Sequence, residues 1–245
     1  MSPNNNTSKI ITTPLPRHIG IIMDGNGRWA KNRGLLRSNG HVRGAEVFKN
    51  ITLYCSKIGI KFLTVYAFST ENWSRPKIEV DFLINLFKKQ LSKALKDFSR
   101  ENVKVNFLGD ISTFPSSLVS LINDVKKASE NNTGMVLNVA LNYGGRSEIL
   151  NAAKNLVKEV LAGNLDESRI SLKDFENNLY TQSQPDPDII IRTGGEIRTS
   201  NFLIWQSAYS EYFFTKTLWP DFTKEDLNNI IDEFSKSKRR FGGVD

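Results

Sequence analysis

Six short apolar runs rich in β-branched residues are spaced along the chain, and they constrain the fold more than any other feature of the sequence. They cover residues 18–23, 62–68, 103–108, 135–141, 188–191 and 211–214. Hydrophobicity in most of these runs is nearly continuous rather than alternating, which is typical of strands buried on both faces of a parallel sheet. We therefore predict a mostly parallel central β-sheet of about six strands.

Longer amphipathic stretches separate the runs. In residues 80–98 the apolar side chains recur mostly at i, i+3 and i+4, which predicts a helix with one apolar face. Similar patterns occur in residues 42–57, 115–129, 148–161 and 224–240. Strands and helices that alternate in this way predict a single α/β domain whose sheet is flanked by helices.

Composition limits the remaining possibilities. The first 13 residues are rich in Asn, Thr and Ser, so we predict a disordered tail over 1–16 and one domain over 17–245. No apolar run approaches the ~20 residues of a membrane-spanning helix. The single cysteine, Cys55, excludes an internal disulfide and is typical of a reducing compartment, so a cytoplasmic protein is expected.

The net charge of +7 is compatible with a polyanionic partner, although charge alone favours a basic surface kept for solubility. A nucleic-acid-binding module would spread its arginines along a groove with interleaved aromatic residues. Here the arginines lie mainly in glycine-flanked loops, so no nucleic-acid partner is expected.

Three polar loops follow predicted strands, where ligands of a parallel sheet bind. They cover residues 24–29, 69–76 and 192–201. In the first loop, Gly25 and Gly27 permit a tight turn with exposed N–H groups, and Arg28 adds a guanidinium for a phosphate. Asp24 suits Mg²⁺, which prefers a few carboxylates together with substrate phosphates. The alternative is a plain strand-to-helix turn capped by Asp24.

The other residues that could bind a ligand can also be explained by structural roles alone. Arg33 and Arg43 are expected on a solvated face. For Arg37 and His41 the local sequence does not decide between a solvated face and a role in binding a diphosphate. Trp73 in the second loop could serve only to anchor that loop to the core. The third loop could be an anion clamp or a surface loop with an arginine–glutamate pair, and the helix over 80–98 could wall a hydrophobic tunnel or simply pack in the core.

The motifs together resemble one family. Residues 18–30, HIGIIMDGNGRWA, resemble the opening motif of the cis-prenyltransferases, the undecaprenyl diphosphate synthase family. Further family motifs follow in order as residues 40–45, 66–76, 142–146, 186–196, 200–206, 218–222 and 239–243, so the resemblance covers nearly the whole chain.

This resemblance implies an activity. An allylic diphosphate, usually farnesyl diphosphate, is lengthened by repeated condensation with isopentenyl diphosphate, with Mg²⁺ as cofactor and a hydrophobic tunnel for the product. The compact length resembles enzymes that make undecaprenyl diphosphate for a cell-wall lipid carrier. The resemblance also implies a homodimer, in which residues 239–243 reach the partner's site, and a product that partitions to the membrane while the protein is at most peripheral to its inner face.

Residue roles carry over by position. Asp24 and Asn72 are implied to be catalytic, and Asp24 and Glu211 to bind metal. The residues implied to bind or surround the two substrates are Gly25, Asn26, Gly27, Arg28, Trp29, Arg37, His41, Phe68, Ser69, Thr70, Glu71, Trp73, Arg75, Arg192, Arg198, Thr199 and Ser200. Ile197 stands where some relatives have a histidine implicated in metal binding, and isoleucine cannot ligate.

The alternative to an enzyme is a non-catalytic protein, the partner subunit of an active cis-prenyltransferase. Such subunits typically lack the catalytic aspartate and much of the first loop. This chain keeps residues 24–29 intact, which favours the enzyme.

Overall fold

A computed structural model describes residues 14–237, with the backbone alone for residues 94–100. Of the predicted tail, residues 14–16 are described, and there Leu15 packs against the core and Pro16 is buried. Residues 1–13 and 238–245 lie outside the described part, and so does the motif over 239–243. No helix within the described part has both the length and the apolar character needed to cross a membrane.

The six predicted strands form one sheet in the order β3-β4-β2-β1-β5-β6, and every neighbouring pair is parallel. The strands are β1 (His18–Ile22), β2 (Phe62–Ser69), β3 (Lys104–Leu108), β4 (Val136–Tyr143), β5 (Ile189–Arg192) and β6 (Glu211–Phe214). The prediction of an α/β domain with a parallel sheet is therefore confirmed. All carboxyl ends of the strands lie at one edge, where the three polar loops begin.

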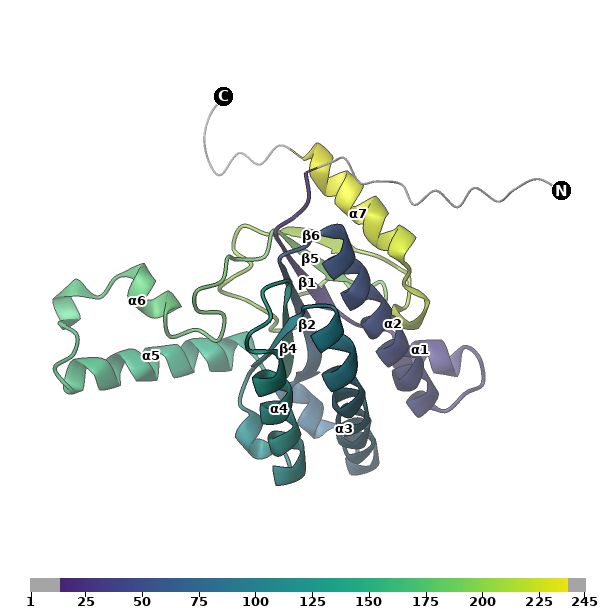
Figure 1. Cartoon of the computed structure of the whole chain (residues 1–245), viewed down its shortest axis with the longest axis horizontal. Helices are drawn as coiled ribbons and strands as arrows, with labels where there is room; N and C mark the ends of the chain where they lie inside the picture. The colour runs from purple at the N-terminus through teal and green to yellow at the C-terminus, as the bar shows by residue number, and fades with distance from the viewer. Residues whose placement is uncertain (1–13, 238–245) are drawn as a thin grey trace.

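Helices α2 (Arg37–Ile58), α3 (Lys77–Arg100) and α4 (Ser116–Ser129) lie along one face of the sheet (Figure 1). Helices α5 (Gly145–Leu161) and α6 (Leu172–Glu176) project away from the sheet, to the left in Figure 1. The remaining helices are α1 (Asn26–Lys31) and α7 (Lys224–Lys236), with short 3₁₀ turns η1 (Thr70–Ser74), η2 (Ile111–Thr113), η3 (Glu167–Arg169) and η4 (Trp219–Asp221).

Alternate residues of the central strands face two separate hydrophobic cores. Ile189 and Ile191 belong to the larger core, whereas Ile190 packs with Phe202 and Leu203 in a smaller one. Because both faces are covered, each strand needs an apolar residue at nearly every position. This explains the continuous hydrophobic runs in the sequence.

Helix α1 lies tightly against α2 at Gly40. A Cβ atom at this glycine would lie 2.0 Å from the backbone oxygen of Asn26, so no larger residue fits without moving one helix. The contact fixes the first polar loop against α2 and thereby sets its position at the sheet edge.

His18 is fully buried at the amino end of β1. Its Nδ1 lies 2.7 Å from the carbonyl oxygen of Pro185 and its Nε2 lies 2.8 Å from the hydroxyl of Thr64. A neutral ring satisfies both contacts, with Nδ1–H as donor and Nε2 as acceptor. Burial lowers the pKa of His18 from 6.5 to about 4 because the charged ring would lose its hydration.

This pKa predicts a loss of stability in acid. Since the folded-state pKa lies below the unfolded value, the contribution is complete above pH 6.5 and is lost as the pH falls towards 4. The two values correspond to about 3 kcal/mol of unfolding free energy. Urea denaturation of the wild type and His18→Gln at pH 4 to 7 should give a shallower pH dependence for the variant; parallel curves would contradict the prediction.

Candidate active site

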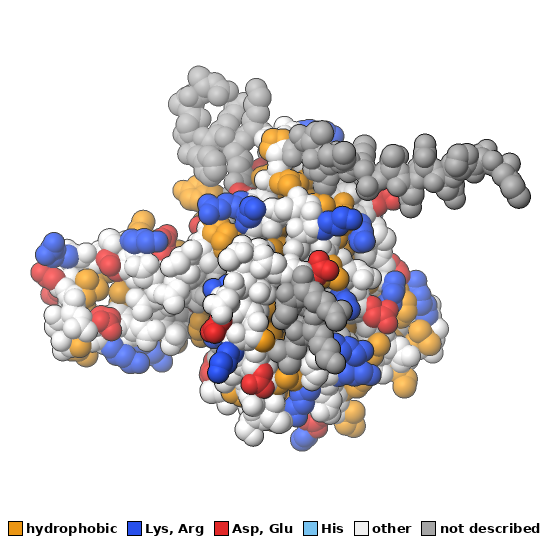
Figure 2. Space-filling view, in the orientation of Figure 1, with side chains coloured by type: hydrophobic (Ala, Val, Ile, Leu, Met, Phe, Trp, Pro, Cys, Tyr) orange, Lys and Arg blue, Asp and Glu red, His pale blue; other side chains and the backbone are white. Residues whose placement is uncertain are grey.

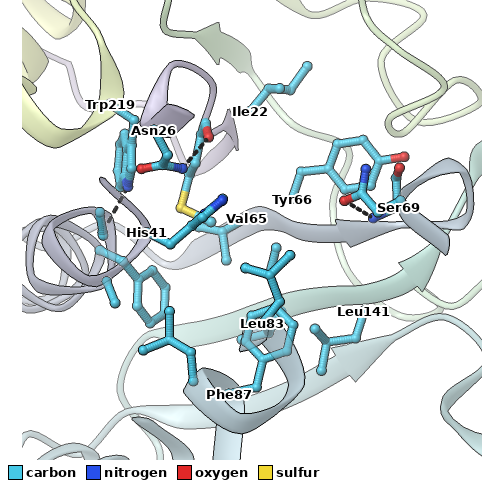
Figure 3. A pocket seen from close by; sticks show the side chains of 18 of the residues that line it. Ile22, Asn26, His41, Val65, Tyr66, Ser69, Leu83, Phe87, Leu141 and Trp219 are labelled. Atoms are coloured by element: carbon cyan, nitrogen blue, oxygen red, sulfur yellow. Dashed lines mark hydrogen bonds between the residues drawn. The ribbon is translucent and has the colours of Figure 1, made fainter. Parts of the chain in front are cut away.

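A cavity of about 610 Å³ lies between α2, α3 and the carboxyl half of the sheet. Figure 3 shows Asn26, His41 and Ser69 around its polar part, with Leu83, Phe87 and Leu141 in the apolar part. Other apolar lining comes from α2, α3, β3, α4 and β4, including Phe48, Leu86, Leu91, Phe107 and Val125. Helix α3 therefore both packs in the core and walls an apolar cavity, so the two interpretations of its sequence hold together.

Nine of the predicted site residues line this cavity. They are Asp24, Asn26, His41, Ser69, Glu71, Asn72, Arg75, Arg192 and Ser200. They come from all three polar loops and from α2, as expected if the carboxyl ends of the strands form one site.

Asp24 lies directly after β1, and its carboxylate is shared by two arginines. Oδ1 is 3.2 Å from Arg28, and Oδ2 accepts a hydrogen bond of 2.9 Å from Arg192. The residue before α1 is Gly25, with φ of 110°, and no side chain caps this helix. The alternative of Asp24 as a helix cap is therefore wrong.

Arg192 joins the first and third loops. Its side chain is 5% exposed and donates to Asp24, to the Arg198 carbonyl and to the Ser200 hydroxyl, the last two at 2.6 Å. Such a fork of donors suits a guanidinium and no other side chain. The third loop thus places one arginine against the catalytic candidate Asp24.

The other arginine of that loop behaves differently. Arg198 is 60% exposed, pairs with Glu196 at 2.6 Å and does not line the cavity, and neither does the neighbouring Thr199. Glu196 also lies 3.4 Å from Arg28. The interpretation as a surface loop with an arginine–glutamate pair therefore holds for Arg198, whereas the anion clamp stays a prediction.

The second loop begins as the 3₁₀ turn η1, which is capped reciprocally by Ser69 and Asn72. Asn72 Oδ1 accepts a 3.1 Å hydrogen bond from the backbone N–H of Ser69. The amide oxygen therefore helps to hold the turn in place.

Asn201, which is not among the predicted site residues, links the second and third loops. Its Nδ2 donates to Glu71 at 3.0 Å, and its Oδ1 accepts from the backbone N–H of Arg146. Burial acts to raise the pKa of Glu71, but hydrogen bonds from Asn201, from its own backbone, and from Ser69 and Thr70 outweigh burial and lower it. The signal that could have found Asn201 was its place in the motif over 200–206.

Three of the predicted substrate-binding residues surround Glu79, which lies in the first turn of α3. Glu79 contacts Arg75 at 2.9 Å, Arg37 at 3.1 Å and His41 at 3.7 Å. The pKa of His41 falls to about 4, chiefly through burial and secondly through the charge of Arg75, so its ring is neutral at pH 7. Sequence reasoning missed Glu79, because an acidic residue in the first turn of a helix is ordinary.

Several predicted residues lie beside the cavity without lining it. Phe68 is buried in the core against Phe87 and Trp73, and Trp73 donates to Asn142, so it anchors its loop. Trp29 donates to Asp221, which also pairs with Arg33 on the surface. The solvated positions expected for Arg33 and Arg43 are confirmed.

Strand register separates the two carboxylates expected to bind one metal. Glu211 is level with Ile189, and Ile189 is level with Ile19 at the amino half of β1, whereas Asp24 follows the opposite end. The offset is roughly 10 Å or more at 3.3 Å per strand residue. Asp24 and Glu211 therefore cannot share an ion within one chain, and no cluster of three metal-ligating side chains occurs among the described residues.

Known sequences similar to this chain all point to the same family. A family profile described as "Putative undecaprenyl diphosphate synthase" matches residues 22–242. The isoprenyl transferase of Clostridium acetobutylicum is 48% identical over 98% of this chain and 94% of its own length. The isoprenyl transferase of Bacillus subtilis is also 48% identical, over 96% of this chain and 90% of its own.

Solved structures share the fold. Lavandulyl diphosphate synthase from Lavandula x intermedia, in complex with dimethylallyl diphosphate, superposes with a TM-score of 0.91 at 36% identity, covering 93% of this chain and 98% of that one. A "probable undecaprenyl diphosphate synthase" from Campylobacter jejuni gives a TM-score of 0.77 at 32% identity, covering 94% and 99%.

Proposed function

Because the chain belongs to the undecaprenyl diphosphate synthase family of isoprenyl transferases, we propose that it makes undecaprenyl diphosphate from farnesyl diphosphate and isopentenyl diphosphate. The broader activity, cis-prenyl chain elongation by a prenyltransferase, follows from family membership. One observation supports the finer proposal most: a single cavity joins a polar part that contains Asp24, Arg75 and Arg192 to an apolar part lined by residues of α2, α3 and α4.

The two ends of the cavity suit the two ends of the substrate. Arg75 and His41 line the polar part together with Asp24, and a diphosphate is bound well by guanidinium groups. Leu83, Phe87 and other apolar side chains would bury the hydrocarbon chain, which favours binding by roughly 0.8 kcal/mol per methylene group.

Mg²⁺ fits Asp24 as part of this proposal. The carboxylate lies at the polar end of the cavity and its side chain is 30% exposed, so an ion can reach it. Mg²⁺ is commonly held by one or two carboxylates together with substrate phosphates, and Asp24 would supply such a carboxylate. When bound, the ion would supply positive charge to stabilise the diphosphate leaving group.

The residues of the chain would act mainly by positioning. In the proposed reaction the allylic carbon–oxygen bond breaks, the diphosphate leaves with the electron pair, and the isopentenyl double bond forms the new carbon–carbon bond. Arg28, Arg37 and Arg75 would stabilise the leaving group, and Arg192 and Ser200 would hold the second diphosphate. Two diphosphates held side by side bring the reacting carbons together.

The final proton would leave to an oxygen of the departing diphosphate. The Asn72 oxygen already accepts the Ser69 N–H, and an amide is a feeble base. The lowered pKa of Glu71 makes that carboxylate a weaker base as well. We assign Asn72 to orienting the reacting groups.

Activity is tested with purified protein, isopentenyl diphosphate and either farnesyl or dimethylallyl diphosphate as primer. With Mg²⁺ the farnesyl primer should give a long polyprenyl product whose size is read by reversed-phase chromatography, and EDTA should abolish it. The absence of a polyprenyl product would contradict the proposed function. Equal turnover with and without EDTA would contradict the proposed metal requirement.

A homodimer is part of the proposed function, and α5 offers a surface for it. Leu150 and Val157 are each 57% exposed and Leu161 is 82% exposed, at i, i+7 and i+11 on one face. This helix projects from the body, and Figure 2 shows hydrophobic side chains at the surface of the projection. A second copy of the chain would cover this face.

Val157→Asp should weaken the dimer at least about a hundredfold, because it places a charge in an apolar contact. Asn151→Asp adds the same charge at another exposed position of α5 and serves as control. Sedimentation equilibrium at micromolar concentration measures both. A monomeric wild type, or a Val157→Asp variant as dimeric as the control, would contradict the proposed interface.

The cytoplasm is the proposed site of action, with at most peripheral contact to the membrane into which the product partitions. The apolar cavity supports this proposal, since a finished chain of this hydrophobicity leaves it most favourably into lipid.

A further inference from the structure

One oxygen of Glu79 organises three groups that the proposed function assigns to the allylic diphosphate. Oε1 accepts from Arg75 at 2.9 Å, lies 3.1 Å from Nε of Arg37 and lies 3.7 Å from Nε2 of His41. Glu79 lies in the first turn of α3, Arg75 in the loop before it, and Arg37 and His41 in the first two turns of α2. A single carboxylate therefore connects α2 to α3 at the mouth of the cavity.

Glu79 and His41 are largely shielded from water, whereas the side chain of Arg37 is 57% exposed. The Glu79 side chain is 14% exposed and that of His41 is 11% exposed. Arg37 also passes close to the first loop, since a Cβ atom at Gly27 would lie 3.0 Å from its Nε. Two guanidinium groups this close would repel each other without an anion between them.

His41 adds an independent observation. Its Nε2 atom is buried and makes no hydrogen bond to any described residue, and His41 is one of the residues that line the cavity. A buried polar atom without a partner is costly, and a ligand oxygen would satisfy it. One hydrogen-bonding position of this cluster, in a residue that lines the cavity, is thus unfilled.

We propose that Glu79 is a positioning residue that holds Arg37 and Arg75 in their binding geometry before substrate arrives, and that the diphosphate of the allylic substrate then displaces its carboxylate from them. This inference rests on the proposed function, because it takes that diphosphate as the ligand. Glu79 and the diphosphate compete for the same donors, so the carboxylate both orders the site and weakens substrate and diphosphate binding.

Glu79→Gln separates these two effects. Glutamine keeps an oxygen that can accept from both arginines but removes the negative charge. We expect Glu79→Gln to bind farnesyl diphosphate and inorganic diphosphate about tenfold more tightly than the wild type, because a repulsion between like charges is gone. Its KM for farnesyl diphosphate should fall while kcat also falls, since the released diphosphate leaves more slowly.

Glu79→Ala removes the acceptor as well as the charge, so the arginines lose their orientation and binding should be weaker than in Glu79→Gln. Glu46→Gln is the matched control, because Glu46 is exposed on α2 and pairs with Arg43. Isothermal titration calorimetry with each of the two ligands measures all four proteins. Circular dichroism confirms that each is folded.

The outcomes are distinct. The role of Glu79 is overturned if Glu79→Gln binds the two ligands no more tightly than the wild type does. It is also overturned if Glu79→Gln binds them no more tightly than Glu79→Ala does. A wild type that forms no polyprenyl product contradicts the proposed function, while the titrations with inorganic diphosphate still decide whether Glu79 competes with that anion.

Discussion

Replacing Asp24 by asparagine is expected to lower the rate of chain elongation by about a thousandfold while the protein stays folded. Asparagine keeps an oxygen that can accept the 2.9 Å hydrogen bond from Arg192, so the link between the first and third loops is preserved. The negative charge needed to hold Mg²⁺ against the diphosphates is lost. The effect should therefore fall on kcat rather than on the melting temperature.

Asp221→Asn is the control for this variant. Asp221 also pairs with an arginine and lies near α1, but it does not line the cavity. Steady-state rates at several Mg²⁺ concentrations would compare the two proteins. If Asp24→Asn kept more than about a tenth of the wild-type rate, or if Asp221→Asn lost as much, Asp24 would not have the role assigned to it.

Replacing Arg192 by alanine is expected to impair both activity and stability. The buried guanidinium makes three hydrogen bonds that connect Asp24 to the third loop, and alanine leaves the acceptors without donors. We expect a loss of about 2–3 kcal/mol in unfolding free energy, less than for a fully buried pair because water can reach Asp24. The rate at low isopentenyl diphosphate should fall about a hundredfold or more.

Arg192→Lys distinguishes charge from geometry. Lysine keeps the positive charge but cannot present the planar fork that reaches Asp24, Ser200 and the Arg198 carbonyl together. Its stability should lie between those of the wild type and Arg192→Ala, whereas its activity should stay close to that of Arg192→Ala. Full activity of Arg192→Lys would show that only the charge matters. Arg43→Ala, which breaks an exposed pair with Glu46, should change neither property.

The sheet was predictable because its strands carry strong local signals. Residues 211–214 form β6 with the predicted bounds, and the other five strands shift by only one or two residues at either end. Helix α2 begins five residues before the apolar pattern starts. Its first turns contain Gly40, which is unfavourable in a helix and is tolerated there because α1 packs against it.

The two shortest α-helices were not among the helices predicted from periodicity. Helices α1 and α6 have six and five residues, which is too few for a 3.6-residue period to show. The predicted helix over 224–240 ends at Lys236, followed by Ser237 in an extended conformation. Residues beyond 237 lie outside the described part.

The sequence predicted many of the residues that line the cavity, but not all of the contacts between those residues. Sequence order placed Asp24, Arg75 and Arg192 at strand ends, and the parallel sheet brought those ends together. Whether Phe68 faces the cavity could not be predicted, because a strand buried on both faces shows no alternation. Strand register, which separates Asp24 from Glu211, is likewise a property of the pairing and not of either segment.

The apolar cavity has a consequence for how such a chain can evolve. Val65, Leu83, Val105, Val125, Val139 and Leu141 line it and at the same time belong to the larger hydrophobic core. A larger side chain at one of these positions would fill empty space and stabilise the fold, but it would shorten the hydrocarbon that fits. A smaller one would lengthen that hydrocarbon at the cost of core contacts. Stability and product capacity are therefore set by the same side chains, and selection for one changes the other.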